Sequence, residues 1–187
     1  LRVSSSGQEY LKGQGSLIIA PVHRSNLDSV LLAPLTRRRL RALAKESLFK
    51  VRPFAWYISA LGAFPIKRES VDRESLRSAL SVLENGETML VFPEGTRQLG
   101  DTIGDLYGGA AYLAAKSSTP VVPVGIAGTE EAMAQGVRIP RPKKVCIVVG
   151  EPIHPPDLEA KHRDLREWTV ELSIRLQAVQ DLARSRV

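Results

Sequence analysis

A histidine and an aspartate five positions apart, His23 and Asp28, could together activate a hydroxyl group. Histidine titrates near neutral pH, so an imidazole can accept the proton of an alcohol while its oxygen attacks a thioester. A carboxylate on the other ring nitrogen would fix the tautomer and stabilise the imidazolium that forms. On a regular helix this spacing directs two side chains apart, so the pair requires His23 in a turn and Asp28 in the first helical turn.

The sequence offers no accompanying nucleophile for an acyl-enzyme intermediate. The motif Gly-x-Ser-x-Gly is absent, and Ser25 is better suited to capping a helix. Cys146 lies in an apolar, strand-like run and is expected to be a buried core residue. Direct attack by an acceptor hydroxyl is therefore the simplest chemistry. The spacing of His23 and Asp28 is not decisive alone, because it arises by chance in about one chain in ten of this composition.

A second candidate segment begins at Gly62 and reads as a strand that ends in two cations, Lys67 and Arg68. The guanidinium of an arginine can bind two phosphate oxygens at once, and a lysine adds a mobile positive charge. Lys67 and Arg68 are therefore candidates for binding the phosphate of an acceptor. The alternative is an ordinary solvated strand end.

A third candidate, residues 92–97, directly follows an apolar strand and reads Phe-Pro-Glu-Gly-Thr-Arg. Glu94 could pair with nearby cations or bind an acceptor hydroxyl, while Thr96 and Arg97 supply a hydroxyl and a second guanidinium. Gly95 would let the backbone approach a ligand closely. A plain turn does not need these four residues together, so we expect them to bind the acceptor.

Three residues complete the set of candidate substrate contacts. Asn26, beside the expected helix start, is placed among the acceptor-binding residues. Val122 and Pro123 lie in an apolar run that is expected to be a core strand. They could also form an apolar wall beside the acyl chain of a substrate.

Basic residues concentrate between Thr36 and Arg52, where seven of them face one acid, in a chain of net charge +6 and pI about 9.7. An uncharged, aromatic-rich stretch, residues 53–66, follows directly. Cations beside aromatics suit the surface of an anionic bilayer. We expect membrane contact through Arg37, Arg38, Arg39, Arg41, Phe54, Trp56 and Tyr57. The alternative is that the aromatics belong to the core and the arginines are solvated.

The 187 residues suit a single globular domain, since 43% are hydrophobic and 25% are charged. No window approaches the ~20 apolar residues of a membrane span. We expect strands near residues 16–22, 41–44, 63–67, 88–92, 121–126 and 145–149. We expect helices from Asp28, near 49–61 with a break at Pro53, and over 71–84, 110–118 and 157–184. This alternation predicts one α/β domain over residues 1–187, with a mostly parallel or mixed central β-sheet flanked by helices.

Strong positive charge would also suit a basic nucleic-acid-binding module. The sequence carries no RNA- or DNA-binding signature, and its aromatics lie in an apolar run rather than between the cations, so we expect no nucleic-acid partner. His154 and His162 are read as structural or surface residues. The spacing of the three histidines does not fit a metal site, and we expect no metal.

In this order, the candidate segments resemble the motifs of the 1-acylglycerol-3-phosphate acyltransferase family of glycerolipid synthesis. His-x-x-x-x-Asp is matched by His23 and Asp28, and a glycine before a strand ending in arginine is matched by residues 62–68. Phe-Pro-Glu-Gly-Thr-Arg is matched at every position of residues 92–97, and a Val-Pro-Val strand by residues 122–124. The resemblance covers residues 12–155, most of the chain.

The resemblance implies the glycerolipid acyltransferase fold and a site in which His23 is the general base and Asp28 its orienting partner. Arg68, Glu94 and Arg97 would hold the phosphate and glycerol of the acceptor, and Gly95 and Thr96 would shape the turn. It implies an acyl-CoA or acyl-carrier-protein thioester as donor, no cofactor, and peripheral attachment to the cytoplasmic face of a membrane. The expected product is phosphatidic acid, made from a lysophosphatidate-like acceptor in phospholipid biosynthesis.

Two features depart from the family pattern. Members often carry a lysine before a Gly-Ala pair after the third motif, where this chain has Gly108. An anion contact could therefore differ, which leaves open acceptors such as glycerol-3-phosphate, another lysophospholipid or a glycolipid. Members also carry a membrane-associated segment ahead of the first motif, and we expect that segment to be short or trimmed here.

Overall fold

The computed structural model describes residues 1–13, 15–36, 38–45, 59, 62–66, 73–137, 139–155 and 162–187. Within them, seven strands form one sheet in the order β1-β7-β6-β2-β5-β3-β4. All neighbouring strands are parallel except β6 and β7, which are antiparallel. The predicted α/β fold with a mostly parallel or mixed central sheet is therefore confirmed.

The bounds of the elements follow the apolar runs of the sequence. The strands are β1 (Arg2–Ser6), β2 (Leu17–Pro21), β3 (Leu40–Lys45), β4 (Ala63–Ile66), β5 (Thr88–Leu90), β6 (Val121–Ala127) and β7 (Lys144–Val149). The α-helices are α1 (Leu27–Leu32), α3 (Arg73–Glu84), α4 (Gly109–Ser117), α5 (Thr129–Ala132) and α6 (His162–Arg184). Two short 3-10 helices are η1 (Gln8–Leu11) and η2 (Ala33–Leu35).

The predicted strands and helices are present wherever the structure describes the chain, with ends shifted by a few residues. Strand β1 was not predicted, because Arg-Val-Ser-Ser-Ser carries one apolar residue and no run that indicates burial. It is the exposed edge strand beside β7. The broken helix expected near residues 49–61 lies outside the described residues, apart from Ser59.

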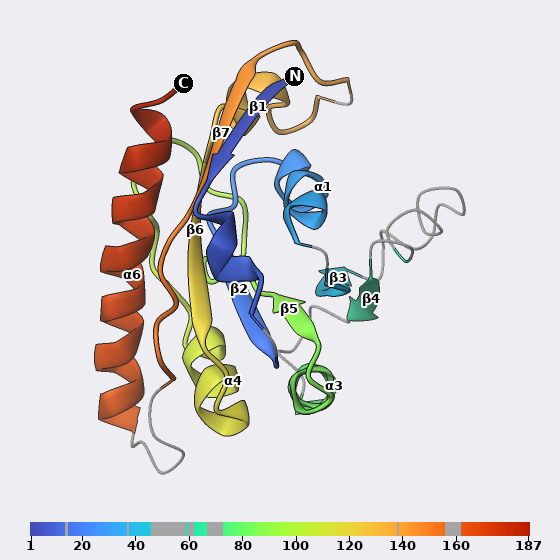
Figure 1. Ribbon diagram of the computed structural model, residues 1–187, viewed down its shortest axis with the longest axis vertical. Helices are drawn as coiled ribbons and strands as arrows, with labels where there is room; N and C mark the ends of the chain where they lie inside the picture. Colours follow the sequence, from blue (N-terminus) through green and yellow to red (C-terminus); the bar gives the residue numbers. More distant parts are fainter. Residues whose placement is uncertain are drawn as a thin grey trace.

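The sheet separates two layers of helices (Figure 1). Helices α3, α4 and α6 contact one another in turn and cover one face. Helix α1 packs on the other face, where Leu32 joins the core. In the described part of the chain, no helix has both the length and the apolar character needed to cross a membrane.

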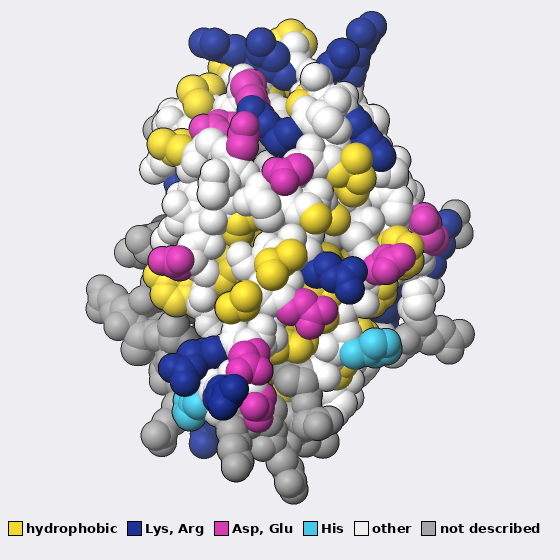
Figure 2. Space-filling model, turned by 90° about the vertical axis from the view of Figure 1, so that its left-hand side faces the viewer, with side chains coloured by type: hydrophobic (Ala, Val, Ile, Leu, Met, Phe, Trp, Pro, Cys, Tyr) yellow, Lys and Arg dark blue, Asp and Glu magenta, His cyan; other side chains and the backbone are white. Residues whose placement is uncertain are grey.

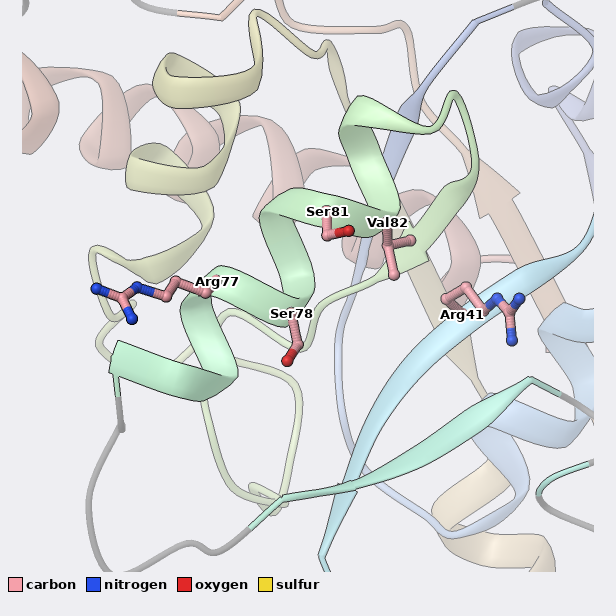
Figure 3. Close-up of a pocket in the computed structure, with 5 residues that line it drawn as sticks. All are labelled: Arg41, Arg77, Ser78, Ser81 and Val82. Carbon is pink, nitrogen blue, oxygen red and sulfur yellow. The ribbon is translucent and has the colours of Figure 1, made fainter.

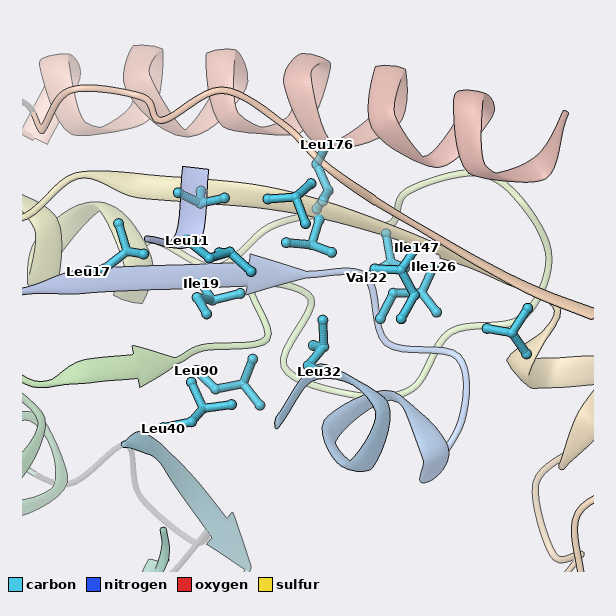
Figure 4. Close-up of a cluster of buried hydrophobic side chains, with 14 residues drawn as sticks. Leu11, Leu17, Ile19, Val22, Leu32, Leu40, Leu90, Ile126, Ile147 and Leu176 are labelled. Atoms are coloured by element: carbon cyan, nitrogen blue, oxygen red, sulfur yellow. The ribbon is translucent and has the colours of Figure 1, made fainter. Parts of the chain in front are cut away.

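The two faces of β2 divide the core, because successive side chains of a strand point to opposite sides. Ile18 and Ala20 pack with buried residues of α3, α4 and α6. Leu17 and Ile19 pack on the other side, where Leu32 also lies (Figure 4). Both faces are therefore apolar, which explains why this strand reads as a continuous hydrophobic run.

Helix α6 lies unusually close to β6 at Gly125. A Cβ atom placed there would lie 2.2 Å from the backbone oxygen of Val179, so only glycine fits. One residue on, the backbone N–H of Ile126 donates to Oε1 of the buried Gln180 at 2.8 Å. This polar side chain therefore ties the helix to the strand at the point of closest approach.

Candidate active site

The catalytic candidates meet at one edge of the sheet because they follow parallel strands. Strand β2 runs parallel to both β5 and β6, so the carboxyl ends of all three strands lie on the same side. His23 comes two residues after β2, and residues 92–97 come two residues after β5. We call this side the carboxyl edge, and it is where α/β folds commonly place their sites.

His23 and Asp28 face each other as predicted, with His23 Nδ1 3.0 Å from Asp28 Oδ2. His23 lies in the turn, and Asp28 lies in the first turn of α1, which begins at Leu27. The imidazole side chain is 15% exposed, whereas that of Asp28 is fully buried. With Nδ1 directed at the carboxylate, Nε2 is the ring nitrogen through which a substrate proton can be taken.

The carboxylate of Asp28 is fixed by the backbone of the turn that precedes its helix. The N–H groups of Arg24 and Ser25 donate to Oδ2 at 2.7 and 2.8 Å. An acid three residues after a serine, bonded back to the serine N–H, is half of a capping box. Among the described residues, Oδ1 of Asp28 has no hydrogen-bond partner, so its observed contacts converge on one oxygen.

Ser25 and Phe92 further fix the turn that carries the imidazole. The hydroxyl of Ser25 donates to the backbone oxygen of Met133 at 2.7 Å, which joins the turn to the end of α5. The ring of His23 stacks on Phe92, with centroids 3.9 Å apart and an interplanar angle of 25°. Phe92 had been identified only as part of a motif, because no sequence pattern reveals a ring contact between separate loops.

Glu94 lies beneath the site and is 1% exposed. Its Oε2 accepts from Arg24 Nη1 at 2.7 Å and from the N–H of His23 at 3.1 Å. Its Oε1 accepts from the N–H of Gly104 at 2.9 Å. Glu94 therefore holds loops of the protein together through both oxygens, and its predicted contact with an acceptor stays a prediction.

Arg24 is the functional residue that sequence reasoning missed. Besides pairing with Glu94, its guanidinium donates to the backbone oxygens of His23, Gly100 and Thr102. Its side chain is 2% exposed, so this is a buried ion pair whose remaining donors bind carbonyls. The available signal was an arginine directly after the histidine together with a glutamate in the loop that follows a buried strand.

The other acceptor-binding candidates within the described residues lie around this pair. Gly95 has a φ of 67° and packs against the ring of Tyr107, so a side chain there would be strained. Thr96 is exposed, Arg97 is partly buried, and Asn26 is exposed at the start of α1. All four residues therefore lie at the carboxyl edge. Their contacts with a substrate stay predictions.

Val122 and Pro123 are buried in β6, between β2 and β7. Val122 belongs to the same core cluster as Ile19, and Pro123 is paired in register with Ala20. The core-strand interpretation therefore holds for both residues. An additional contact with an acyl chain stays a prediction.

A loop over the carboxyl edge, residues 98–105, is held by α6. The N–H of Ile103 donates to Oε1 of Gln177 at 2.8 Å, and Arg184 pairs with Asp101 at 2.8 Å and Glu131 at 2.9 Å. Partial burial raises the pKa of Glu131, but hydrogen bonds from its own backbone N–H and Arg184 more than offset this, so its pKa lies below the usual value. Helix α6 thus holds the 98–105 loop in place, and that loop in turn binds the carboxylate of Glu94.

The predicted membrane-contact residues do not gather at this edge where the structure describes them. Arg38 bonds the backbone oxygens of Gly15 and Gly86, and Arg41 pairs with Glu87 at 2.6 Å. These groups lie near the starts of β2, β3 and β5, at the opposite, amino edge. Arg39 is exposed. Lys67, Arg68, Arg37, Phe54, Trp56 and Tyr57 lie outside the described residues.

A pocket of about 480 Å³ opens beside Arg41, between β3 and α3 (Figure 3). Its lining residues are Arg41, Arg77, Ser78, Ser81 and Val82. It holds no carboxylate or imidazole, so it lacks the groups that acyl transfer needs. Among the described residues, no three metal-ligating side chains come together.

An imidazole oriented by a buried carboxylate at the carboxyl edge of an α/β sheet has the geometry that could activate a hydroxyl group. Residues 2–127 match the Acyltransferase family, and the chain belongs to that family. The predicted relationship and the enzyme class, an O-acyltransferase, are therefore confirmed.

Two relatives and one crystal structure make the comparison more specific than the family match. A 1-acyl-sn-glycerol-3-phosphate acyltransferase of Bacillus subtilis is 27% identical over 178 residues, which cover 93% of this chain and 86% of the relative. One from Streptococcus pneumoniae is 33% identical over 114 residues, 60% of this chain and 41% of its own length. The crystal structure of the 1-acyl-sn-glycerophosphate (LPA) acyltransferase PlsC from Thermotoga maritima superposes with a TM-score of 0.77 at 29% identity, covering 97% of this chain and 72% of that one.

Proposed function

We propose that this protein transfers a fatty acyl group from an acyl-CoA or acyl-carrier-protein thioester to the hydroxyl of a lysophosphatidate-like acceptor. The product would be phosphatidic acid, an intermediate of phospholipid biosynthesis. The observation that carries the proposal is the contact of His23 with the buried Asp28 at 3.0 Å. The names of its relatives support the choice of acceptor.

In the proposed reaction, Nε2 of His23 takes the proton of the acceptor hydroxyl as its oxygen attacks the thioester carbon. Asp28 holds the Nδ1–H tautomer beforehand and stabilises the imidazolium afterwards. Collapse of the tetrahedral intermediate breaks the carbon–sulfur bond, and the imidazolium returns its proton to the departing thiolate. Atoms and charge balance without a cofactor or a covalent intermediate on the protein.

The acceptor phosphate needs cations near the imidazole. Arg97 follows the glycine of the 92–97 loop and is partly buried at the carboxyl edge, which supports its role in phosphate binding. Lys67 and Arg68 are proposed to add to it from the segment after β4. Thr96 and Asn26 are proposed to bind the glycerol hydroxyls.

Removal of the imidazole tests the proposal. We expect His23→Ala to remain folded and to lose acyl transfer by about 100-fold or more, as when a general base is removed. Asp28→Asn should also lower turnover, because the amide can favour the wrong tautomer. His154→Ala is the matched control, since His154 is exposed and, within the described part of the chain, forms a hydrogen bond only through its backbone oxygen, with Trp168 Nε1. Near-normal turnover by His23→Ala would end the proposal.

The acceptor is identified by product mass spectrometry with an acyl-CoA donor and a panel of hydroxyl acceptors. The panel holds 1-acyl and 2-acyl lysophosphatidate, glycerol-3-phosphate, neutral lysolipids and a glycolipid. We expect 1-acyl lysophosphatidate to give the highest turnover. A preference for an acceptor without phosphate would redirect the proposal to another acyltransferase of the same family.

We further propose that the protein acts at the cytoplasmic face of a membrane as a peripheral protein. An acceptor with a long acyl chain resides in a bilayer, and the basic pI of about 9.7 favours an anionic surface. Separation of membranes from supernatant, with and without high salt, tests this: release by salt alone is the expected result. Release by neither salt nor alkaline wash would contradict peripheral attachment.

A further inference from the structure

The connection between α5 and β7 carries a concentrated positive charge. From Met133 to Lys144 the sequence contains four basic residues and no acid. Arg141, Lys143 and Lys144 are exposed. The β7 strand starts here and runs antiparallel to β6, so this loop belongs to the carboxyl edge. It is a separate feature from the basic cluster of residues 36–52.

The same loop exposes apolar side chains. Ile139 is 79% exposed and Val137 is 38% exposed. Pro140 and Pro142 flank Arg141 and restrict the backbone, which lowers the entropy lost when the loop binds a surface. Exposed aliphatic residues among cations match the two components of an anionic bilayer surface: apolar chains and negatively charged head groups.

One hydrogen bond connects the start of this loop to the turn that carries His23, and a second ties the loop to α5. Ser25, two residues after His23, donates to the backbone oxygen of Met133, where the loop begins. The N–H of Arg141 donates to the backbone oxygen of Ala132 at 2.7 Å, which closes the loop back on α5. A surface that binds the loop would therefore lie beside the imidazole.

Neighbouring elements extend the same end of the molecule. Arg2 is the first residue of β1 and lies in register with Lys144, whereas Arg186 donates to the hydroxyl of Ser6 at the other end of β1. Lys and Arg side chains mark the upper rim of Figure 2, the end that carries both termini in Figure 1. Two acids nearby, Asp101 and Glu131, share the single guanidinium of Arg184.

We propose that Val137 and residues 139–144 form the surface that docks this protein on an anionic lipid bilayer, with the carboxyl edge facing the lipid. Ile139 and Val137 enter the head-group region, and Arg141, Lys143 and Lys144 bind anionic head groups. The proposal rests on the proposed function for its rationale, since a lipid acceptor must reach His23 from the membrane. It orients the protein on the membrane, with His23 toward the lipid, and it adds a contact surface to the one predicted around residues 36–52.

Vesicle flotation tests the surface directly, with vesicles of phosphatidylcholine alone and of an equimolar mixture of phosphatidylcholine and phosphatidylglycerol. Wild-type protein should bind the mixed vesicles more tightly. The variant Lys143→Gln/Lys144→Gln should lose about thirtyfold in affinity for them, since each cation near an anionic surface contributes about a factor of five. Ile139→Ser should lose about tenfold on the same vesicles.

Matched controls come from other surfaces. Lys12→Gln/Lys116→Gln removes two exposed lysines from the amino edge, and Ile174→Ser removes a 65% exposed isoleucine from the outer face of α6. Both should bind vesicles as the wild type does. Circular dichroism and urea unfolding verify that every variant is folded, so weaker binding is not a consequence of unfolding.

Acyl transfer to a short-chain, monomeric acceptor separates docking from chemistry. The loop variants should keep turnover on this soluble acceptor and lose it on acceptor embedded in mixed vesicles. Vesicle binding equal to wild type in both loop variants would overturn the docking proposal. Loop-dependent vesicle binding by a protein that acylates no acceptor would instead refute the proposed function and leave the docking surface standing.

Discussion

The two edges of the sheet hold their charges in different ways. At the carboxyl edge, Arg24 and Glu94 form an ion pair whose side chains are 2% and 0% exposed, and backbone groups bind the rest of their polar atoms. At the amino edge, Arg41 and Glu87 form a pair whose side chains are 30% and 28% exposed. The distances are similar, 2.7 and 2.6 Å, so exposure is the main difference.

This contrast separates positioning from stability. Burying two charges costs free energy that their attraction only partly returns, so a buried pair is a poor means of stabilising a fold. Its fixed geometry is its advantage, because Arg24 and Glu94 both bond the backbone of His23. We infer that the buried pair holds the catalytic turn in place, whereas the exposed pair only joins two neighbouring strands.

Breaking the buried pair should give the largest effect. Arg24→Ala leaves the carboxylate of Glu94 buried without its cation, and we expect it to lower the free energy of unfolding by about 3–5 kcal/mol. Urea unfolding measures this loss. The double variant Arg24→Met/Glu94→Leu should regain much of the stability while turnover stays low, because the turn is no longer fixed. A loss below about 1 kcal/mol in Arg24→Ala would make the two pairs equivalent.

An intermediate effect is expected at Gln177, which connects α6 to the loop over the carboxyl edge. Gln177→Ala leaves the N–H of Ile103 without its acceptor and should cost about 1–2 kcal/mol. Hydrogen exchange at the amide of Ile103 should accelerate in the same variant. Gln177→Glu retains an oxygen acceptor and should keep the slow exchange; equal acceleration in both variants would show that the hydrogen bond is not what protects the amide.

The smallest effect is expected at the exposed pair. Arg41→Ala and Glu87→Gln should each cost at most about 1 kcal/mol and leave turnover unchanged. The hydrogen bond from Arg41 lowers the pKa of Glu87, so this stabilisation is present above the ordinary carboxyl pKa and is lost as the pH falls through the lowered value. Unfolding measured across that acidic range should show the loss in the wild type and not in Glu87→Gln.

The architecture was largely predictable because hydrophobic periodicity reports burial. Strands buried on both faces, such as β2 and β6, read as continuous apolar runs, and α3 reads as an amphipathic helix that ends at Asn85-Gly86. Gly86 there has a φ of 73°, and the N–H of Glu87 bonds the oxygen of Val82, as helix-ending glycines commonly allow. The edge strand β1 escaped prediction because exposure leaves no such pattern.

The contact between His23 and Asp28 was also predictable, because their spacing and a helix-start signal both concern neighbouring residues. Arg24, Phe92 and Gln180 were not predictable as contacts, since their partners lie in distant parts of the chain. Arginine and glutamine are usually solvated, so their burial here runs against the composition rule. The position of Arg38 and Arg41 at the amino edge likewise depends on strand order, which one sequence does not reveal.

The close approach at Gly125 bears on where the protein could be divided. The family match ends at residue 127, the last residue of β6, yet this strand packs against Val179 and Gln180, more than fifty positions later. A fragment cut at that boundary would lack both the helix that seats on the glycine and the strand that closes the sheet on that side. The shortest fragment of this enzyme that folds on its own is therefore expected to extend well beyond the segment that matches the family.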